Sequence, residues 1–235
     1  MLVNEQRKKL SKRRDKVALE QYREEGYLAD AMVNYLMTLG WSAGDDVEIR
    51  PWSEIESLFR LEGVNLSPAF FDVRKLGAFN GEYIRMMTAD EFAAECARWV
   101  PESWDRDRLS LIAPHVQPRL VTFSDLEGTV DFLFGPVSMD EGSWEKAMTT
   151  EFAPALLTAT RVAYADLPDW SADALKEALE SVMEPFELKL GKAQAPVRVA
   201  VTGRTVGPPL FESLEALGRE ESLARIDAAI SRLPG

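Results

Sequence analysis

The sequence has little of the chemistry that disulfide and metal sites need. It contains one cysteine, Cys96, and one histidine, His115, in 235 residues. One cysteine excludes an internal disulfide, and two soft ligands are too few for a zinc site. No run of eighteen apolar residues is present, and the basic N-terminus lacks the apolar stretch of a secretory signal. We therefore expect a protein of a reducing, cytoplasmic compartment, with no metal site and no membrane partner.

Positive charge is also scarce, except at the N-terminus. The chain has 27 Lys and Arg against 39 Asp and Glu, a formal net charge of -12. Seven basic residues nevertheless fall within the first sixteen positions: Arg7, Lys8, Lys9, Lys12, Arg13, Arg14 and Lys16. The acidic remainder would repel a polyanion on average, so nucleic-acid binding would need local basic sites. The basic segment itself is either a solvated tail or a loop that handles phosphate groups.

Helical patterns dominate the rest of the chain. Apolar residues recur at three- and four-residue spacing in 18–26 and 28–41, which predicts helices there. Residues suited to helix ends separate these and the later stripes: Gly26 and Gly40 as C-caps, Ser53, Ser67 (before Pro68) and Ser171 as N-caps, Thr88 with Glu91 as a capping box, and Gly218 as a break. The pattern predicts an all-α, or mainly α, fold.

Two segments interrupt this pattern. Residues 196–203, "PVRVAVTG", alternate like a strand and are rich in β-branched residues. Their helical surroundings favour a helix, and the sequence leaves both assignments open. The stretch from Gly135 to Gly142 contains the turn residues of a domain boundary.

Four stretches in order carry a resemblance to a known family. Lys9 to Arg13, "KLSKR", resembles the Lys-Met-Ser-Lys-Ser signature loop of class I aminoacyl-tRNA synthetases. Residues 22–42, 71–85 and 197–220 resemble later segments of the same enzymes. Together the four stretches are similar to bacterial glutamyl-tRNA synthetases over nearly the whole chain.

The resemblance implies a domain order. In that family a nucleotide-binding domain with a His-x-Gly-His signature precedes the loop, whereas only eight residues precede Lys9 here. We therefore expect a shortened chain: a signature loop in 1–16, a connecting, stem-contact helical domain with the first part of the anticodon-binding region in 17–135, and an α-helical anticodon-binding cage in 136–235. The expected chain is a monomer, lacks its N-terminal catalytic half as a partner, and is inactive alone.

The resemblance also implies chemistry for the loop. The intact enzyme activates glutamate with ATP and Mg²⁺ and then transfers it to tRNA(Glu), while this shortened chain is expected to hold no cofactor. Lys9, Ser11 and Lys12 take the catalytic positions, and Lys9 and Lys12 those that bind the ATP phosphates. Lysine ammonium groups suit this role because negative charge spreads over the leaving pyrophosphate.

Five further residues occupy family positions that bind the anticodon. Arg119 resembles the arginine that reads the third anticodon base, and Arg198 one that stacks on a base. Pro208, Leu210 and Phe211 resemble a base-contacting turn, although Gly207 stands where some members carry a polar residue. Whether tRNA(Gln) is also bound is left open.

Simpler interpretations exist for these residues and for the whole chain. A lone arginine such as Arg119 is commonly a surface or salt-bridge residue, and Phe211 is readily a core residue. The chain could also be a stand-alone helical tRNA-binding adaptor or a helical protein-interaction module.

Overall fold

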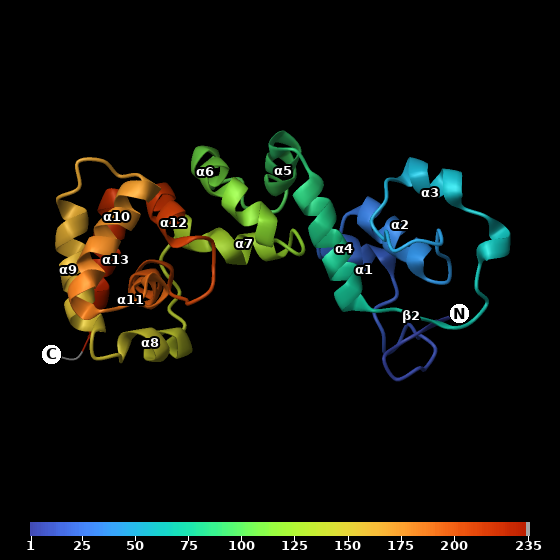
Figure 1. Cartoon of the computed structure of the whole chain (residues 1–235), viewed down its shortest axis with the longest axis horizontal. Helices are drawn as coiled ribbons and strands as arrows, with labels where there is room; N and C mark the ends of the chain where they lie inside the picture. The colour runs from blue at the N-terminus through green and yellow to red at the C-terminus, as the bar shows by residue number, and fades with distance from the viewer. Residues whose placement is uncertain (234–235) are drawn as a thin grey trace. The chain divides into compact units, whose positions relative to one another are not determined.

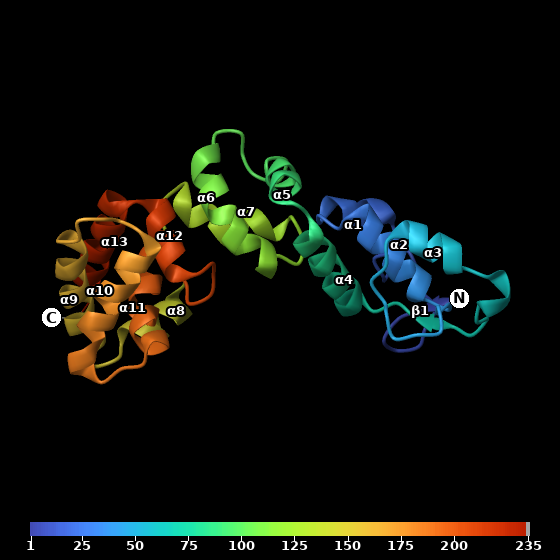
Figure 2. The same ribbon diagram turned by 45° about the horizontal axis from the view of Figure 1, so that its top comes forward.

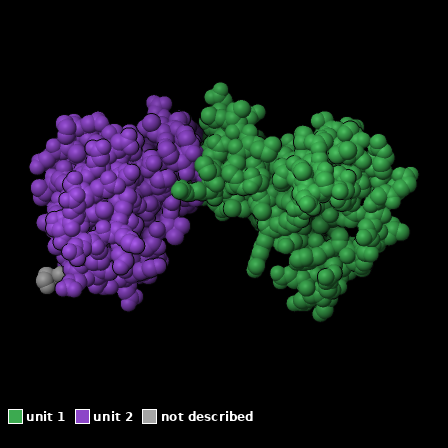
Figure 3. Space-filling view, in the orientation of Figure 1, with its two compact units in different colours: residues 1–101, 117–127 green, residues 102–116, 128–235 purple. Residues whose placement is uncertain are grey.

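The computed structural model describes residues 1–233, and over these residues it is mainly α-helical. It contains thirteen α-helices and two strands of two residues each in this range. The prediction of a mainly α fold is confirmed (Figure 1). Two compact units form: residues 1–101 with 117–127, and residues 102–116 with 128–235 (Figure 3). No helix in the described part of the chain is long and apolar enough to cross a membrane.

Unit 1 holds the first elements of the chain. They are β1 (Leu2–Val3), α1 (Leu19–Glu24), α2 (Ala29–Thr38), α3 (Trp52–Leu58), η1 (Leu61–Gly63), β2 (Ala69–Phe70), α4 (Val73–Met86), α5 (Ala89–Cys96) and η2 (Gln117–Arg119). The two strands pair in parallel, with Leu2 opposite Ala69 and Val3 opposite Phe70. Helices α2 and α4 pack against each other (Figures 1 and 2). A buried cluster joins these two helices to α1: it contains Tyr22 of α1, Met32 and Tyr35 of α2, and Leu76 and Phe79 of α4.

A buried amide joins distant parts of unit 1. Asn80 on α4 accepts a hydrogen bond from the Leu28 N–H at 2.7 Å and donates to the Val121 carbonyl at 2.6 Å. Gly26, at φ +79°, lies so close to Phe123 that an added Cβ would stand 2.5 Å from the Phe123 nitrogen. These contacts fix residues 117–127 beside α4, although they lie thirty or more residues further along the chain.

Unit 2 holds the remaining helices. They are α6 (Arg106–Val116), the second half of α7 (Asp125–Val130), η3 (Asp131–Leu133), α8 (Glu141–Met148), α9 (Ala153–Ala165), α10 (Ala172–Met183), η4 (Glu184–Phe186), α11 (Leu190–Thr202), α12 (Leu210–Leu217) and α13 (Arg219–Arg232). Helix α9 packs on both α10 and α13, and α11 packs on α8 and α13 (Figure 2).

Helix ends were predicted well where the signal is local. The capping box is present: the Glu91 N–H donates to Thr88 Oγ1, and the Glu91 carboxylate accepts from the Thr88 N–H. Ser171 caps α10, Gly26 and Gly40 have positive φ, and Gly218 separates α12 from α13.

Two predicted N-caps are wrong. Helix α3 begins at Trp52 after Pro51, so Ser53 lies inside it. Ser67 and Pro68 do not start a helix, because Ala69 and Phe70 are drawn into the pairing with β1. Helix α4 begins later, where the Asp72 carboxylate accepts from the N–H groups of Arg74 and Lys75 at 2.9 and 3.2 Å.

The ambiguous segment 196–203 is helical through Thr202. It forms the end of α11, and Gly203, in the left-handed region at φ +76°, caps it. Val197, Val199 and Val201 are all fully buried. The alternating sequence pattern therefore reflects a helix covered on more than one face, and not a strand with one wet face.

The compact units and the predicted domain ranges divide the chain differently. The chain passes between the units after residues 101, 116 and 127. The stretch from Gly135 to Gly142 lies wholly within unit 2. The functional division into loop, connecting domain and anticodon-binding domain stays a prediction.

Candidate functional site

The basic N-terminal segment is a folded loop held from within by two side chains. Asn4 Oδ1 accepts from the N–H groups of Gln6 and Lys8, both at 3.1 Å. The Asp15 carboxylate accepts from the Ser11 N–H at 2.8 Å and from the Asn4 amide at 3.2 Å. These bonds hold the pKa of Asp15 below its ordinary value, with the Ser11 N–H as the largest cause. Asp15 thus closes the loop around Ser11.

The cations of this loop point to solvent. Six of them are exposed, and no ion pair is found for their side chains in residues 1–233: Arg7, Lys8, Lys9, Lys12, Arg13 and Arg14. Lys16 differs, since it pairs with Glu25 and lies 4.0 Å from the centroid of the Tyr22 ring. The loop therefore leaves Lys9 and Lys12 exposed, while Lys16 anchors it to α1.

Arg119 is exposed at the end of η2, which α4 holds in place. Gln117 donates to the carbonyls of Ile84 and Met87, both at 2.9 Å, and Arg85 donates to the Pro118 carbonyl at 3.4 Å. The Arg119 side chain has no hydrogen bond or ion pair with any described residue. A fixed turn thus carries an arginine that is available to a ligand.

Arg198 lies on α11 and braces the turn that follows it. Its Nη1 donates to the Pro208 carbonyl at 2.5 Å. The Gly203 carbonyl accepts from the Asp140 N–H at 2.9 Å, and a Cβ on Gly203 would collide with the Ser138 carbonyl. The loop from Gly203 to Pro209, here called the 203–209 loop, is therefore tied at both ends.

The middle of the 203–209 loop is tied as well. Arg204 donates to the Gly128 carbonyl at 2.5 Å and pairs with Asp131. The Thr205 N–H donates to Ser143 Oγ at 3.1 Å. Val206, between these anchors and Pro208, is 79% exposed. The loop is thus an ordered platform that exposes an apolar side chain at its tip.

The other predicted contact residues lie at the base of this platform. Leu210 and Phe211 begin α12 and are 1% and 8% exposed, and Pro208 is buried too. Their side chains pack within unit 2, so the surface near them is supplied by Arg198 and the 203–209 loop. The structure brings Arg198 and Pro208 together, while Arg119 belongs to the other compact unit.

Sequence reasoning missed the arginines that hold backbone carbonyls in unit 2. Arg225 donates to the carbonyls of Phe132, Val201 and Gly135 at 2.8, 2.8 and 3.1 Å. Arg108 donates to the Leu133 carbonyl at 2.6 Å. Together with Arg204 they fix residues 128–135. The only local signal was an arginine between two glycines in 203–207.

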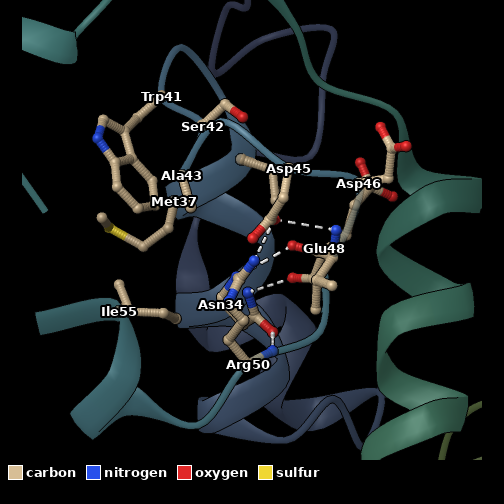
Figure 4. A pocket seen from close by; sticks show the side chains of 12 residues that line it. Asn34, Met37, Trp41, Ser42, Ala43, Asp45, Asp46, Glu48, Arg50 and Ile55 are labelled. Carbon is tan, nitrogen blue, oxygen red and sulfur yellow. Dashed lines mark hydrogen bonds and ion pairs between the residues drawn. The ribbon is translucent and has the colours of Figure 1, made fainter. Parts of the chain in front are cut away.

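The hollow beside Arg50 in unit 1 is a structural feature. It has a volume of about 270 Å³, and Trp41, Met37 and Ile55 lie on one side of it (Figure 4). Arg50, 6% exposed, pairs with Asp45 and Glu54 and donates to the Val47 carbonyl at 3.0 Å. Its donors are used in closing the 45–54 segment, so the guanidinium is not offered to a ligand.

Comparison with known proteins assigns these two regions to known domains. The model described as anticodon binding domain matches residues 91–230, which include Arg119, Arg198 and the 203–209 loop. The model of the catalytic domain of class I (E and Q) tRNA synthetases matches residues 1–78, which include the basic loop. The chain belongs to the glutamate–tRNA ligase family.

Individual members of that family show the same likeness. The chain is 56% identical to a glutamate–tRNA ligase of Salinispora arenicola over 100% of its own length and 52% of that protein. It is 54% identical to one of Thermobifida fusca, over 99% of the chain and 51% of that protein. It thus spans about half the length of the curated relatives it matches.

Solved structures agree with this assignment. A crystal structure of a glutamate tRNA ligase from Elizabethkingia meningosepticum has a TM-score of 0.79 at 30% identity, covering 91% of this chain and 43% of that one. A second, from Elizabethkingia anophelis, has a TM-score of 0.77 at 30% identity, over 89% of this chain and 42% of that one. The likeness thus covers about nine tenths of this chain.

Proposed function

We propose that this chain is the tRNA-recognition part of a glutamate–tRNA ligase and that it binds the anticodon loop of tRNA(Glu). The observation that carries this proposal is Arg119: an exposed arginine with no partner in the described residues, on a turn held by Gln117 and Arg85. It lies within the segment that matches the anticodon binding domain. Unpaired anticodon bases offer hydrogen-bonding edges and stacking faces, and a guanidinium can use both.

The 203–209 loop suits a second contact in this proposal. Arg198 offers a planar guanidinium, whose face can stack on a base while Nη1 holds the Pro208 carbonyl. Val206 offers an apolar tip beside it. Pro208, Leu210 and Phe211 then act as the support of the loop, since their side chains are buried.

The basic loop has a different proposed role, toward ATP as substrate. Lys9 and Lys12 are exposed, unpaired cations on an ordered loop, which fits the binding of phosphate groups. No group of three or more His, Cys, Asp or Glu residues placed to hold a metal ion is found in residues 1–233. In this proposal the two lysines stabilise the negative charge on the leaving pyrophosphate. The enzyme is cytoplasmic, and the remainder of the ligase supplies the rest of its active site.

A binding titration tests the proposal. The chain is titrated with a stem-loop carrying the tRNA(Glu) anticodon and with the same stem carrying a permuted loop, at two salt concentrations. The proposal predicts that the glutamate loop binds more tightly than the permuted loop by about 4 kcal/mol or more. This value is the lower end of the range by which specific binding of a nucleic acid exceeds non-specific binding. Equal affinity for both RNAs, with equal salt slopes, would leave only non-specific phosphate binding. Binding of neither RNA would favour a protein-interaction module.

A further inference from the structure

The basic loop of unit 1 contains two turns, which Figure 1 draws in dark blue. The first turn spans residues 4–8, where the Asn4 N–H donates to the Lys8 carbonyl at 2.9 Å. The Asn4 side chain holds the same turn, since its Oδ1 accepts from the Lys8 N–H at 3.1 Å. Lys9 follows directly and pairs antiparallel with Val3, which is buried. The first turn therefore fixes the backbone that carries Lys9.

The second turn spans residues 11–15 and carries Lys12. The Asp15 N–H donates to the Ser11 carbonyl at 2.9 Å, and the Asp15 carboxylate accepts from the Ser11 N–H at 2.8 Å. Both backbone polar groups of Ser11 are therefore bonded to the same residue. Because Lys12 is the next residue along the chain, these two bonds also set where its backbone lies.

One hydrogen bond between side chains joins the two turns. Asn4 Nδ2 donates to Asp15 Oδ1 at 3.2 Å, while Asp15 Oδ2 accepts from the Ser11 N–H. Asn4 and Asp15 are both half-buried. The pKa of Asp15 is lowered first by the Ser11 N–H and next by the Asn4 amide, so the ionised carboxylate is the form that these bonds favour. The Asn4–Asp15 pair thus links the turn before Lys9 to the turn that contains Lys12.

We propose that Asn4 and Asp15 are positioning residues that hold Lys9 and Lys12 where both can contact one polyphosphate group. Lys9 follows the turn that Asn4 holds, and Lys12 lies in the turn that Asp15 holds. Two ammonium groups repel each other, so a loop without this pair would spread them apart. A loop that is ordered before binding also loses less conformational entropy when the ligand arrives. The inference rests on the proposed role of the two lysines toward ATP, and it names the residues that arrange them.

The negative charge of Asp15 separates this proposal from a purely electrostatic role. A carboxylate among the cations of the loop lowers the positive potential that attracts phosphate. If Asp15 acted only through its charge, its removal would strengthen phosphate binding. If Asp15 positions the lysines, its removal weakens phosphate binding, although the loop becomes more positive. The two roles therefore predict opposite results for the same substitution.

The test is a titration of the chain with inorganic pyrophosphate, followed by NMR of the Ser11 and Lys12 backbone amides. In Asp15→Asn, the new amide turns a donor toward either the Ser11 N–H or the Asn4 amide, so one bond is lost. In Asn4→Asp, a second carboxylate faces that of Asp15 and repels it. Both variants should bind pyrophosphate about fivefold or more weakly, less than the full value of a hydrogen bond to a charged group because the pair is half-buried. The two substitutions change the net charge in opposite directions, so charge alone cannot weaken both.

The double variant Asn4→Asp/Asp15→Asn exchanges the two groups and keeps the net charge. The new carboxylate at position 4 can accept from the N–H groups of Gln6 and Lys8 and from the new amide at position 15. The oxygen of that amide can accept from the Ser11 N–H. Pyrophosphate affinity should return to within about twofold of the wild type, and the Ser11 amide resonance, displaced in each single variant, should return as well. A double variant that binds as weakly as the single variants, or more weakly, would overturn the proposal.

Glu5→Gln is the matched control for charge. Glu5 is exposed in the first turn, and its side chain has no hydrogen bond or ion pair with any described residue. Its substitution removes one negative charge from the loop, as Asp15→Asn does, but leaves the Asn4–Asp15 pair intact. Pyrophosphate binding should stay within about twofold of the wild type. A loss equal to that of Asp15→Asn would show that the pair has no special part and would overturn the proposal.

Lys12→Gln tests the proposed function itself. It removes one of the two ammonium groups and should weaken pyrophosphate binding by about fivefold or more. Unchanged binding in Lys12→Gln would reject the proposed role of the lysines, and this inference with it. Weaker binding in Lys12→Gln, together with binding in Asp15→Asn that is as tight as in the wild type or tighter, would reject this inference alone.

Discussion

Arg198 on α11 donates from Nη1 to the carbonyl of Pro208 at 2.5 Å, across the 203–209 loop. The bond links the last turns of one helix to the residues just before α12. The Arg198 side chain is proposed to stack on a base, and the 203–209 loop is proposed to lie beside that base. The bond joins the two. Order in the loop and the position of the guanidinium are therefore coupled.

Replacing Arg198 with lysine keeps the charge but removes the planar guanidinium. We expect Arg198→Lys to weaken binding of the glutamate anticodon stem-loop by about 1–3 kcal/mol, the range for loss of one stacked base. Fluorescence anisotropy at fixed salt gives the affinity. Arg204→Lys is the control, because Arg204 holds the same loop through Gly128 and Asp131. If both variants lose the same affinity for the stem-loop and show the same increase in hydrogen exchange of the loop, Arg198 supports the loop and does not contact a base.

Gly203 should not tolerate a side chain. It has φ +76°, and an added Cβ would collide with the Ser138 carbonyl. We expect Gly203→Ala to lower the free energy of unfolding by about 1–3 kcal/mol or more in urea titrations. Gly191→Ala is the matched control: it lies in the first turn of α11 with nothing within 4 Å of the new Cβ, and should be neutral or stabilising by about 0.5–1 kcal/mol. Similar effects of both substitutions would contradict the ordered loop.

Unit 1 should lose stability at alkaline pH. Burial raises the pKa of the Cys96 thiol from 9.0 to about 12, and that of Tyr22 and Tyr35 from 10.0 to about 12. A raised folded-state pKa means that the native state holds these protons more tightly than the unfolded chain. This contribution is complete below pH 9 and is lost as the pH rises toward 12. The urea midpoint should thus fall across that window, and the Cys96 thiol should resist a disulfide reagent until the protein unfolds. A flat midpoint from pH 9 to 11 would contradict the burial of these groups.

The sequence predicted the fold where neighbouring residues decide it. The Thr88–Glu91 capping box and the Ser171 cap need only residues three positions apart, and both are present. The helix predicted at Ser67 failed because the Ala69–Phe70 segment pairs with Leu2–Val3, and no local signal encodes a partner 67 residues away.

For the candidate site too, the sequence predicted some features and could not predict those that depend on distant residues. The resemblance placed Arg119 and Arg198 in the segment of the anticodon binding domain. It could not reveal that Leu210 and Phe211 are buried, because apolar residues suit a core and a base platform equally. The bond of Arg204 to the Gly128 carbonyl spans 76 positions and depends on tertiary packing alone.

The most direct test of the account compares the affinities of the wild-type chain and the Arg119→Gln variant for two RNAs. The glutamate anticodon has C as its third base and the glutamine anticodon has G. Cytosine presents acceptors at O2 and N3 that a guanidinium can donate to, whereas guanine presents a donor at N1. Wild type and variant are titrated at two salt concentrations with a glutamate stem-loop and its third-base G variant. The account predicts that Arg119→Gln weakens binding of the glutamate loop by about 1–3 kcal/mol and changes binding of the G variant much less. Equal losses on both RNAs, with the salt slope reduced by about one, would make Arg119 a phosphate contact and contradict its reading of the third base.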